Sequence, residues 1–172
     1  MDLKDLNDLY FHMEWADASV WRAVFASDAA RADPKLRELL YHIHMVQRAF
    51  LRVWQGETRF TPLPAFDDLE SLIDWGRRYY PELLRQFELW TEDDLSKPLN
   101  MPWASSLTKP LGREPEETTL AETAKQVALH SLYHRGQVNA RLRELGGEPP
   151  LVDYIAWLWL GRPQADWRFE AF

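Results

Sequence analysis

The amino-acid sequence predicts an all-α protein, an antiparallel four-helix bundle that forms a single domain over residues 1–172. Three observations predict this fold. Apolar residues recur at spacings of three and four in four long segments, which is the period of an amphipathic helix. Most connections between these segments are short, and short connections favour antiparallel neighbours. No linker, internal repeat or low-complexity tract divides the chain, whose length suits one domain with a sizeable core.

The first two helices are expected over residues 3–27 and 34–55. Asp33 is placed to cap the second of them, because its carboxylate can accept hydrogen bonds from the free backbone amides of the first turn. Pro34 suits that turn, since a proline has no amide hydrogen to leave unpaired there. Gly56 is a natural end for the helix.

The third helix is expected over residues 67–90, and Pro81 predicts a kink or a break in it near Tyr80. The segment that follows, residues 92–117, is rich in Pro, Ser and Thr and lacks a helical period. Its strand signal is weak. We therefore expect either an irregular segment or a hairpin before the fourth helix.

The fourth helix is expected to begin after Thr118 or Thr119 and to reach about Leu145. If Thr119 is the cap, Glu122 completes a capping box, in which each side chain bonds the backbone amide of the other residue. Asp153 is placed to cap a short additional helix with the sequence YIAWLWLG near the carboxyl terminus.

The composition argues against several classes of protein. The formal net charge of -7 is unfavourable for a protein whose main partner is nucleic acid, because phosphate binding needs a basic field. The absence of cysteine excludes disulfides, thiolate metal sites and a cysteine nucleophile. We find neither a signal peptide nor a run of about 18 apolar residues that could span a membrane. The expectation is a cytoplasmic protein with no nucleic-acid or membrane partner.

Two of the five histidines, His130 and His134, lie four positions apart in the fourth helix. Residues at this spacing are stacked one turn above the other, so both imidazoles can point to one place. Neutral imidazole nitrogens are good ligands for borderline metals such as Zn²⁺ and Ni²⁺. Two ligands rarely hold a metal firmly, so a third is expected from His12, His42 or His44.

The helical phase favours His42 as the third ligand. His42 shares an apolar stripe with Leu39 and Val46, so we expect it to point into the bundle, and we expect His44 on the flank of the same helix. His44 remains the alternative ligand. The same pattern also fits histidines that only make core hydrogen bonds, and the residues alone leave both interpretations open.

Three residues beside this pair have further predicted roles. A glycine inside a helix costs about 0.8–1 kcal/mol relative to alanine, so Gly136 is expected to allow close approach of another helix or to leave room for a ligand. Arg135 is expected to form a structural ion pair rather than to act in catalysis. Gln137 turns back toward the histidines and either orients a metal ligand or makes an ordinary bond between helices.

Three stretches of the chain are similar to a known family. HSLYHRGQVNARLRELGGEPP, with VDY just beyond it, resembles the signature of the DinB-like superfamily of damage-inducible proteins. EWADASVWRAV and LLYHIHMVQRAFLRVW fit the first and second helices of that family. The resemblance implies a helical bundle in which His42, His130 and His134 bind a divalent metal, zinc or nickel, with His44 competing for the first position. It also implies a homodimer.

Two classes of function follow. Relatives with known chemistry resemble metal-dependent transferases that use a low-molecular-weight thiol such as bacillithiol or mycothiol. The first hypothesis is therefore a metal-dependent enzyme, a thiol S-transferase or a hydrolase, that acts on a small thiol or electrophile; no catalytic residue is identified. The second is a non-catalytic metal-binding module for stress response or interaction. For the second, the segment YIAWLWLGR offers an apolar interface, unless it packs on the bundle's own core.

Overall fold

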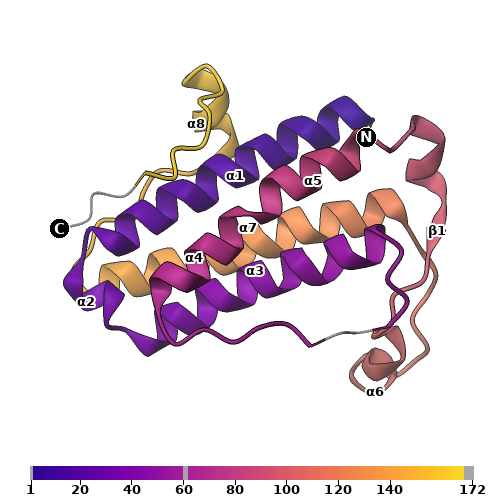
Figure 1. Ribbon diagram of the computed structural model, residues 1–172, viewed down its shortest axis with the longest axis horizontal. Helices are drawn as coiled ribbons and strands as arrows, with labels where there is room; N and C mark the ends of the chain where they lie inside the picture. Colours follow the sequence, from indigo (N-terminus) through magenta and orange to yellow (C-terminus); the bar gives the residue numbers. More distant parts are fainter. Residues whose placement is uncertain (1, 60–61, 169–172) are drawn as a thin grey trace.

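The computed structural model describes residues 2–59 and 62–168, which form an all-α structure with one pair of two-residue strands. Four helical arms lie side by side (Figure 1): α1 (Leu3–Phe25), α3 (Pro34–Trp54), α4 (Leu69–Arg77) continued by α5 (Tyr79–Phe87), and α7 (Leu120–Glu144). The shorter helices are α2 (Asp28–Arg31), α6 (Thr108–Leu111), α8 (Tyr154–Trp159), and the 3₁₀ helices η1 (Glu92–Ser96) and η2 (Ala104–Leu107). None of the helices described has the length and hydropathy needed to cross a membrane. The predicted all-α class and the short helix near the carboxyl terminus are confirmed.

Side-chain caps begin the two helices that carry the candidate site. At the start of α3, a carboxylate oxygen of Asp33 accepts a hydrogen bond from the Leu36 amide at 2.8 Å. At the start of α7, the Thr119 hydroxyl accepts from the Glu122 amide, and the Glu122 carboxylate accepts from the Thr119 amide. Of the two predicted caps, Thr119 is therefore correct. Gly56 follows α3 with a φ of +92°, a conformation that glycine adopts without strain.

The third arm is broken close to Tyr80, as Pro81 predicted, so it consists of two helices. α4 ends at Arg77 and α5 begins at Tyr79, with Pro81 in the first turn of α5. The missing amide of a proline costs nothing in a first turn, because amides there have no partner within the helix. The chain therefore ends one helix and begins another ahead of Pro81. α2 was not predicted; it is a single turn in which the Ser27 hydroxyl accepts from the Ala30 amide.

The segment before α7 is a loosely closed hairpin with helical turns inside it. Strands β1 (Pro98–Leu99) and β2 (Thr118–Thr119) pair antiparallel, and η2 and α6 lie between them. Figure 1 shows this segment at the end of the bundle where α3 ends and α7 begins. There the Trp103 ring contacts the Phe50 ring edge-on, with centroids 5.2 Å apart.

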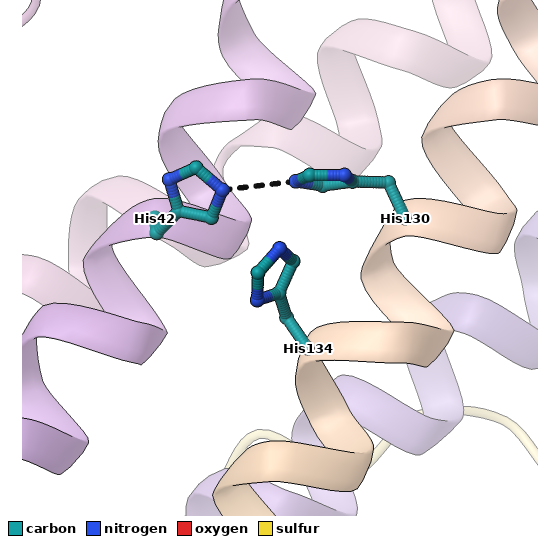
Figure 2. A group of neighbouring side chains, drawn as sticks. All are labelled: His42, His130 and His134. Atoms are coloured by element: carbon teal, nitrogen blue, oxygen red, sulfur yellow. Dashed lines mark hydrogen bonds between the residues drawn. The ribbon is translucent and has the colours of Figure 1, made fainter.

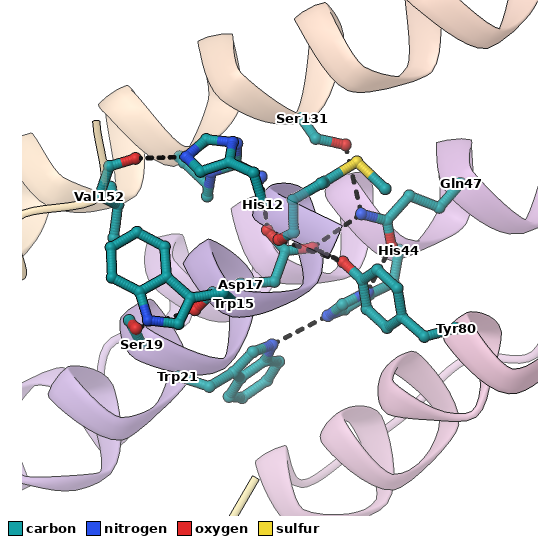
Figure 3. A network of polar contacts seen from close by, with 12 residues as sticks. His12, Trp15, Asp17, Ser19, Trp21, His44, Gln47, Tyr80, Ser131 and Val152 are labelled. Atoms are coloured by element: carbon teal, nitrogen blue, oxygen red, sulfur yellow. Dashed lines mark hydrogen bonds and ion pairs between the residues drawn. The ribbon is translucent and has the colours of Figure 1, made fainter. Parts of the chain in front are cut away.

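A buried polar network crosses the bundle between two apolar clusters. Asp17 of α1 accepts from the guanidinium of Arg135 at 2.7 Å, from the side-chain amide of Gln47 at 2.8 Å, and from the Tyr80 hydroxyl. The Gln47 amide also donates to the Ser131 hydroxyl at 3.2 Å. Figure 3 shows how Asp17, Gln47, Tyr80 and Ser131 meet. Because they come from α1, α3, α5 and α7, the network connects all four arms.

His44 also belongs to this network, and both of its ring nitrogens are used in hydrogen bonds. Its Nε2 accepts from the Trp21 indole N–H at 2.9 Å, so its ring hydrogen lies on Nδ1 and is donated to Gln47 Oε1 at 2.8 Å. Burial lowers the pKa of His44, which agrees with a neutral ring. α4 packs so closely that a Cβ on Gly76 would lie 2.6 Å from the His44 ring.

Replacing Gly76 with alanine should destabilise the protein by about 1–3 kcal/mol, the usual cost of forcing an extra methyl group into a packed core. The His44 ring cannot give way without losing its bonds to Trp21 and Gln47. Gly136→Ala is the matched control, because a Cβ there meets nothing within 4 Å, and it should stabilise α7 by about 0.5–1 kcal/mol. Urea denaturation of both variants gives the comparison, and equal effects would contradict it.

Candidate metal centre

Three histidine side chains converge between α3 and α7. Figure 2 shows His42 from α3 facing His130 and His134 from α7. One ring nitrogen of each lies within 4.8 Å of the others, and the Nε2 atoms of His42 and His130 are 3.0 Å apart. The ring centroids are separated by 4.3 to 5.1 Å. The structure thus brings together the three residues that the sequence nominated as metal ligands.

The expected orientation of α3 is wrong in one respect. The stripe that contains Leu39, His42 and Val46 is only half-buried, whereas His44 and Gln47 are buried in the core. Periodicity missed this because the buried side of α3 carries polar residues of the network, so that an apolar stripe does not mark it. His42 reaches the group because the half-buried side of α3 that carries it faces α7.

The other two histidines lie outside the group. His44 uses both ring nitrogens within the core network. His12 of α1 donates from Nε2 to the backbone carbonyl of Val152 at 2.9 Å, and its ring packs against Tyr154 and Trp157 of α8. His12 therefore anchors α8 to the bundle.

Gln137 contacts the group directly. Its Oε1 accepts a hydrogen bond from Nδ1 of His134 at 2.8 Å. This bond places the ring hydrogen on Nδ1 and leaves the lone pair of Nε2 available, which is how a metal-ligating histidine is usually oriented. Of the two predicted roles for Gln137, a bond between helices is wrong, because both residues belong to α7.

The electrostatics of the group favour neutral imidazoles. Burial, together with the neighbouring His134 and His42 rings, lowers the pKa of His130 to about 4. Burial and the His134 ring also lower the pKa of His42. Neutral rings offer nitrogen lone pairs at physiological pH, which metal coordination requires.

Without a bound metal, the protein should lose stability as the pH falls from about 6.5 to about 4. A histidine whose pKa is lower in the folded state binds more protons when the chain unfolds, so acid favours unfolding over this interval. His12, His42 and His44 act in the same direction. Urea denaturation at several pH values should show a shallower decline for His130→Asn than for the wild type. Equal slopes would contradict the assignment of a lowered pKa to His130.

The donor set fits a divalent transition metal. Nitrogen ligands about 2.0–2.1 Å from a tetrahedral ion lie roughly 3.3 Å from one another. The 3.0 Å between the Nε2 atoms of His42 and His130 is close to that spacing, and no pair in the group is more than 4.8 Å apart. Imidazole suits zinc, nickel, copper and iron, so the donors indicate a class of metals rather than one element.

A groove adjoins the group along α3 and α7, and sequence reasoning did not find it. Its volume is about 460 Å³, and Gln137 belongs both to this groove and to the histidine group. Its lining residues are Lys35, Leu39, Gln137, Ala140, Arg141 and Glu144. No sequence pattern marks it, because its walls come from two helices about 100 residues apart. Leu39 and Gln137, each three residues from a histidine of the group, line the groove, whereas the three histidines do not.

The structure also tests the predicted roles of Arg135 and Gly136, which neighbour the histidines in α7. Arg135 forms a buried ion pair with Asp17 at 2.7 Å, which confirms its predicted structural role. Gly136 is exposed, and a Cβ there would contact nothing within 4 Å. Close approach of another helix of this chain is therefore the wrong explanation for Gly136.

Comparison with known proteins relates this chain to a family and to a bacterial relative. The family model described as DinB family matches residues 6–166. The protein named Protein DinB from Bacillus subtilis (strain 168) is 22% identical over 170 residues, an alignment that covers 91% of this chain and 95% of that relative. The family match includes all three histidines of the group.

Proposed function

This chain belongs to the DinB family, and on that premise we propose that His42, His130 and His134 bind one divalent metal ion for a metal-dependent enzyme. The convergence of three imidazoles from two helices carries the proposal. The reaction class is thiol S-transfer, in which a small thiol loses its proton and its sulfur displaces a leaving group from an electrophile. In hydrolysis, the alternative, water takes the place of the thiol, and the proton in either case passes to the leaving group or to solvent. A cytoplasmic location and zinc or nickel as the metal are part of this proposal.

Different residues would bind the ion and the substrate. Three neutral imidazoles leave the full charge of a divalent ion uncompensated, and such an ion lowers the pKa of a water or thiol that it binds. Gln137 keeps Nε2 of His134 directed at the group. The groove that Gln137 lines is the proposed place for a substrate.

The composition supports a thiol that arrives from outside the chain. The protein has no cysteine, so an attacking thiolate has to belong to a cosubstrate. The group itself contains no carboxylate. Glu122, the acidic residue of the first turn of α7, is occupied by its capping box with Thr119. The ion lowers the pKa of a thiol that it binds, so the thiol loses its proton at neutral pH without the help of a general base.

Two measurements test this proposal. Metal analysis of protein purified without a histidine tag should find about one divalent ion for each chain. The cobalt-substituted protein should then change its visible spectrum when small thiols such as glutathione or cysteine are added, because sulfur ligation alters the cobalt bands. The proposed enzymatic function would be contradicted if no thiol changed the cobalt spectrum and the protein hydrolysed no ester or amide in a substrate screen.

The second candidate is a non-catalytic metal-binding module for stress response or interaction. The exposed side of α8 favours it: Ala156 and Trp157 are buried, but Trp159 is 80% exposed and Ile155 is 48% exposed. α8 therefore both packs on the bundle and presents an apolar surface. One bound ion per chain with no response to thiols or hydrolysable substrates is the result that this candidate predicts.

Replacing Gln137 with leucine should weaken metal binding by about 10- to 100-fold, the usual cost of losing the partner that orients a metal-ligating histidine. The fold should be unaffected, because Gln137 is half-buried and its bond lies within one helix. Competition with a chelator gives the affinity. Gln126→Leu, an exposed glutamine of α7, serves as the control. Unchanged affinity in Gln137→Leu would show that the bond to His134 does not orient the ligand.

A further inference from the structure

A pocket with a volume of about 420 Å³ lies beside α1, away from the histidine group. Its described lining residues come from α1, α5, α8 and the segment after α8, rather than from α3 and α7, which carry the three histidines. Figure 1 shows α8 and the chain that follows it beside α1. This pocket, the α1 pocket, is therefore a site separate from the candidate metal centre.

Much of the wall of the α1 pocket is apolar. Phe11 of α1, Leu84 of α5 and Trp157 of α8 line it. Trp157 is held firmly, because it is 2% exposed and its indole N–H donates to the backbone carbonyl of Pro163 at 3.0 Å. Phe11, in contrast, is 44% exposed. An apolar group that entered the pocket would cover this ring, and burial of apolar surface favours binding.

Glu14 of α1 places a carboxylate in the same pocket. Its Oε1 accepts from the Trp167 indole N–H at 3.1 Å, and no cationic side chain among the described residues pairs with it. Burial raises the pKa of Glu14; the bond from Trp167 opposes this rise, and the Asp17 carboxylate adds to it. A carboxylate that is partly removed from water without a positive partner is unfavourable, and a cation in the pocket would relieve that cost.

Arg162 also lines the pocket, but it is engaged elsewhere. Its guanidinium pairs with Asp8 at 3.4 Å and lies over the Trp157 ring, 5.9 Å from the ring centre. Its backbone φ is +56°, a left-handed conformation that residues other than glycine rarely adopt and that persists only where the surroundings hold it. Because Arg162 balances the charge of Asp8, the charge that remains in the pocket is the negative charge of Glu14.

We propose that the α1 pocket binds a small organic cation, a primary amine joined to an aromatic or aliphatic group. The ammonium group would donate to the Glu14 carboxylate, and the apolar group would pack against the three apolar walls. A pocket of a few hundred Å³ with apolar walls and a single uncompensated charge is typical of sites for such molecules. This site goes beyond the proposed metal-dependent activity and does not depend on it.

Isothermal titration calorimetry of the full chain with three indole compounds tests the proposal. Tryptamine carries an ammonium group, tryptophol a neutral hydroxyl and indole-3-propionate a carboxylate on the same ring. Tryptamine should bind about tenfold more tightly than tryptophol, because hydrogen bonds between charged groups are stronger than those to a neutral one. Indole-3-propionate should bind more weakly than tryptophol, since its charge repels Glu14.

Two variants separate the charge from the apolar walls. Glu14→Gln should raise the dissociation constant of tryptamine about tenfold, to that of tryptophol. Its fold should be kept, because the glutamine carbonyl can still accept from Trp167. Phe11→Ala should weaken the binding of tryptamine and tryptophol by the same factor, because both compounds use that wall. Glu38→Gln, which changes an exposed glutamate of α3, is the matched control and should bind all three compounds as the wild type does.

His130→Ala should bind tryptamine as tightly as the wild type does, so the α1 pocket and the metal centre can fail separately. Binding that is lost in His130→Ala and kept in Glu14→Gln would overturn the proposal by assigning the amine to the histidine group. Failure of the wild type to bind tryptamine, or a preference over tryptophol that Glu14→Gln preserves, would also overturn it. Tighter binding of indole-3-propionate that Arg162→Gln abolishes would assign the pocket to anions instead.

Discussion

Replacing His130 with alanine should abolish stoichiometric binding of a divalent metal. Loss of the residue that orients a ligand already costs about 10- to 100-fold in affinity, so loss of the ligand itself should cost more. His130 lies close to both other histidines, because its Nε2 is 3.0 Å from that of His42 and its ring centroid is 4.3 Å from that of His134. The measurement is metal content by mass spectrometry on protein without a histidine tag, supported by competition with a chelator.

The single variants His42→Ala and His134→Ala should behave in the same way, since all three residues are half-buried and belong to one group. His12→Asn is the control, because His12 bonds Val152 and takes no part in the group. It should keep the metal. A His42→Ala protein that retains its metal, while His44→Ala loses it with the fold intact, would transfer the third ligand position to His44.

Replacing Asp17 with leucine should destabilise the protein by about 3–5 kcal/mol, because it breaks a buried ion pair by removing one partner. Arg135, 2% exposed, would keep its charge in the core without a counterion. The Gln47 amide and the Tyr80 hydroxyl would lose an acceptor at the same time. Urea denaturation at neutral pH gives the free energy of unfolding.

Two comparisons make this prediction specific to the buried pair. Glu116→Gln removes one partner of the exposed pair with Arg113 and should leave the free energy of unfolding unchanged within error. Adding Arg135→Met to Asp17→Leu should recover part of the lost stability, because no unpaired charge is then left in the core. If Asp17→Leu were as harmless as Glu116→Gln, the network would not hold the four arms together.

Features that depend on neighbouring residues could be predicted from the sequence. The caps at Asp33 and Thr119 follow from hydrogen bonds that span three residues, and the stacking of His130 on His134 follows from the pitch of one helix. Short-range geometry of this kind is nearly the same in every protein. The helical class and the pair of candidate ligands on α7 were therefore determined by the sequence itself.

Features that depend on contacts between distant residues were decided only by the tertiary structure. The sequence placed His44 on the flank of α3, yet the partners that hold it in the core come from α1 and α4: Trp21 donates to its ring, and Gly76 leaves room for it. Asp17 and Arg135 are 118 positions apart, and no local pattern links them. Whether a polar side chain is buried depends on which partners other helices bring to it, since burial is stable only when its hydrogen bonds are satisfied. That is why periodicity could identify the helices but not the side of α3 that faces the core.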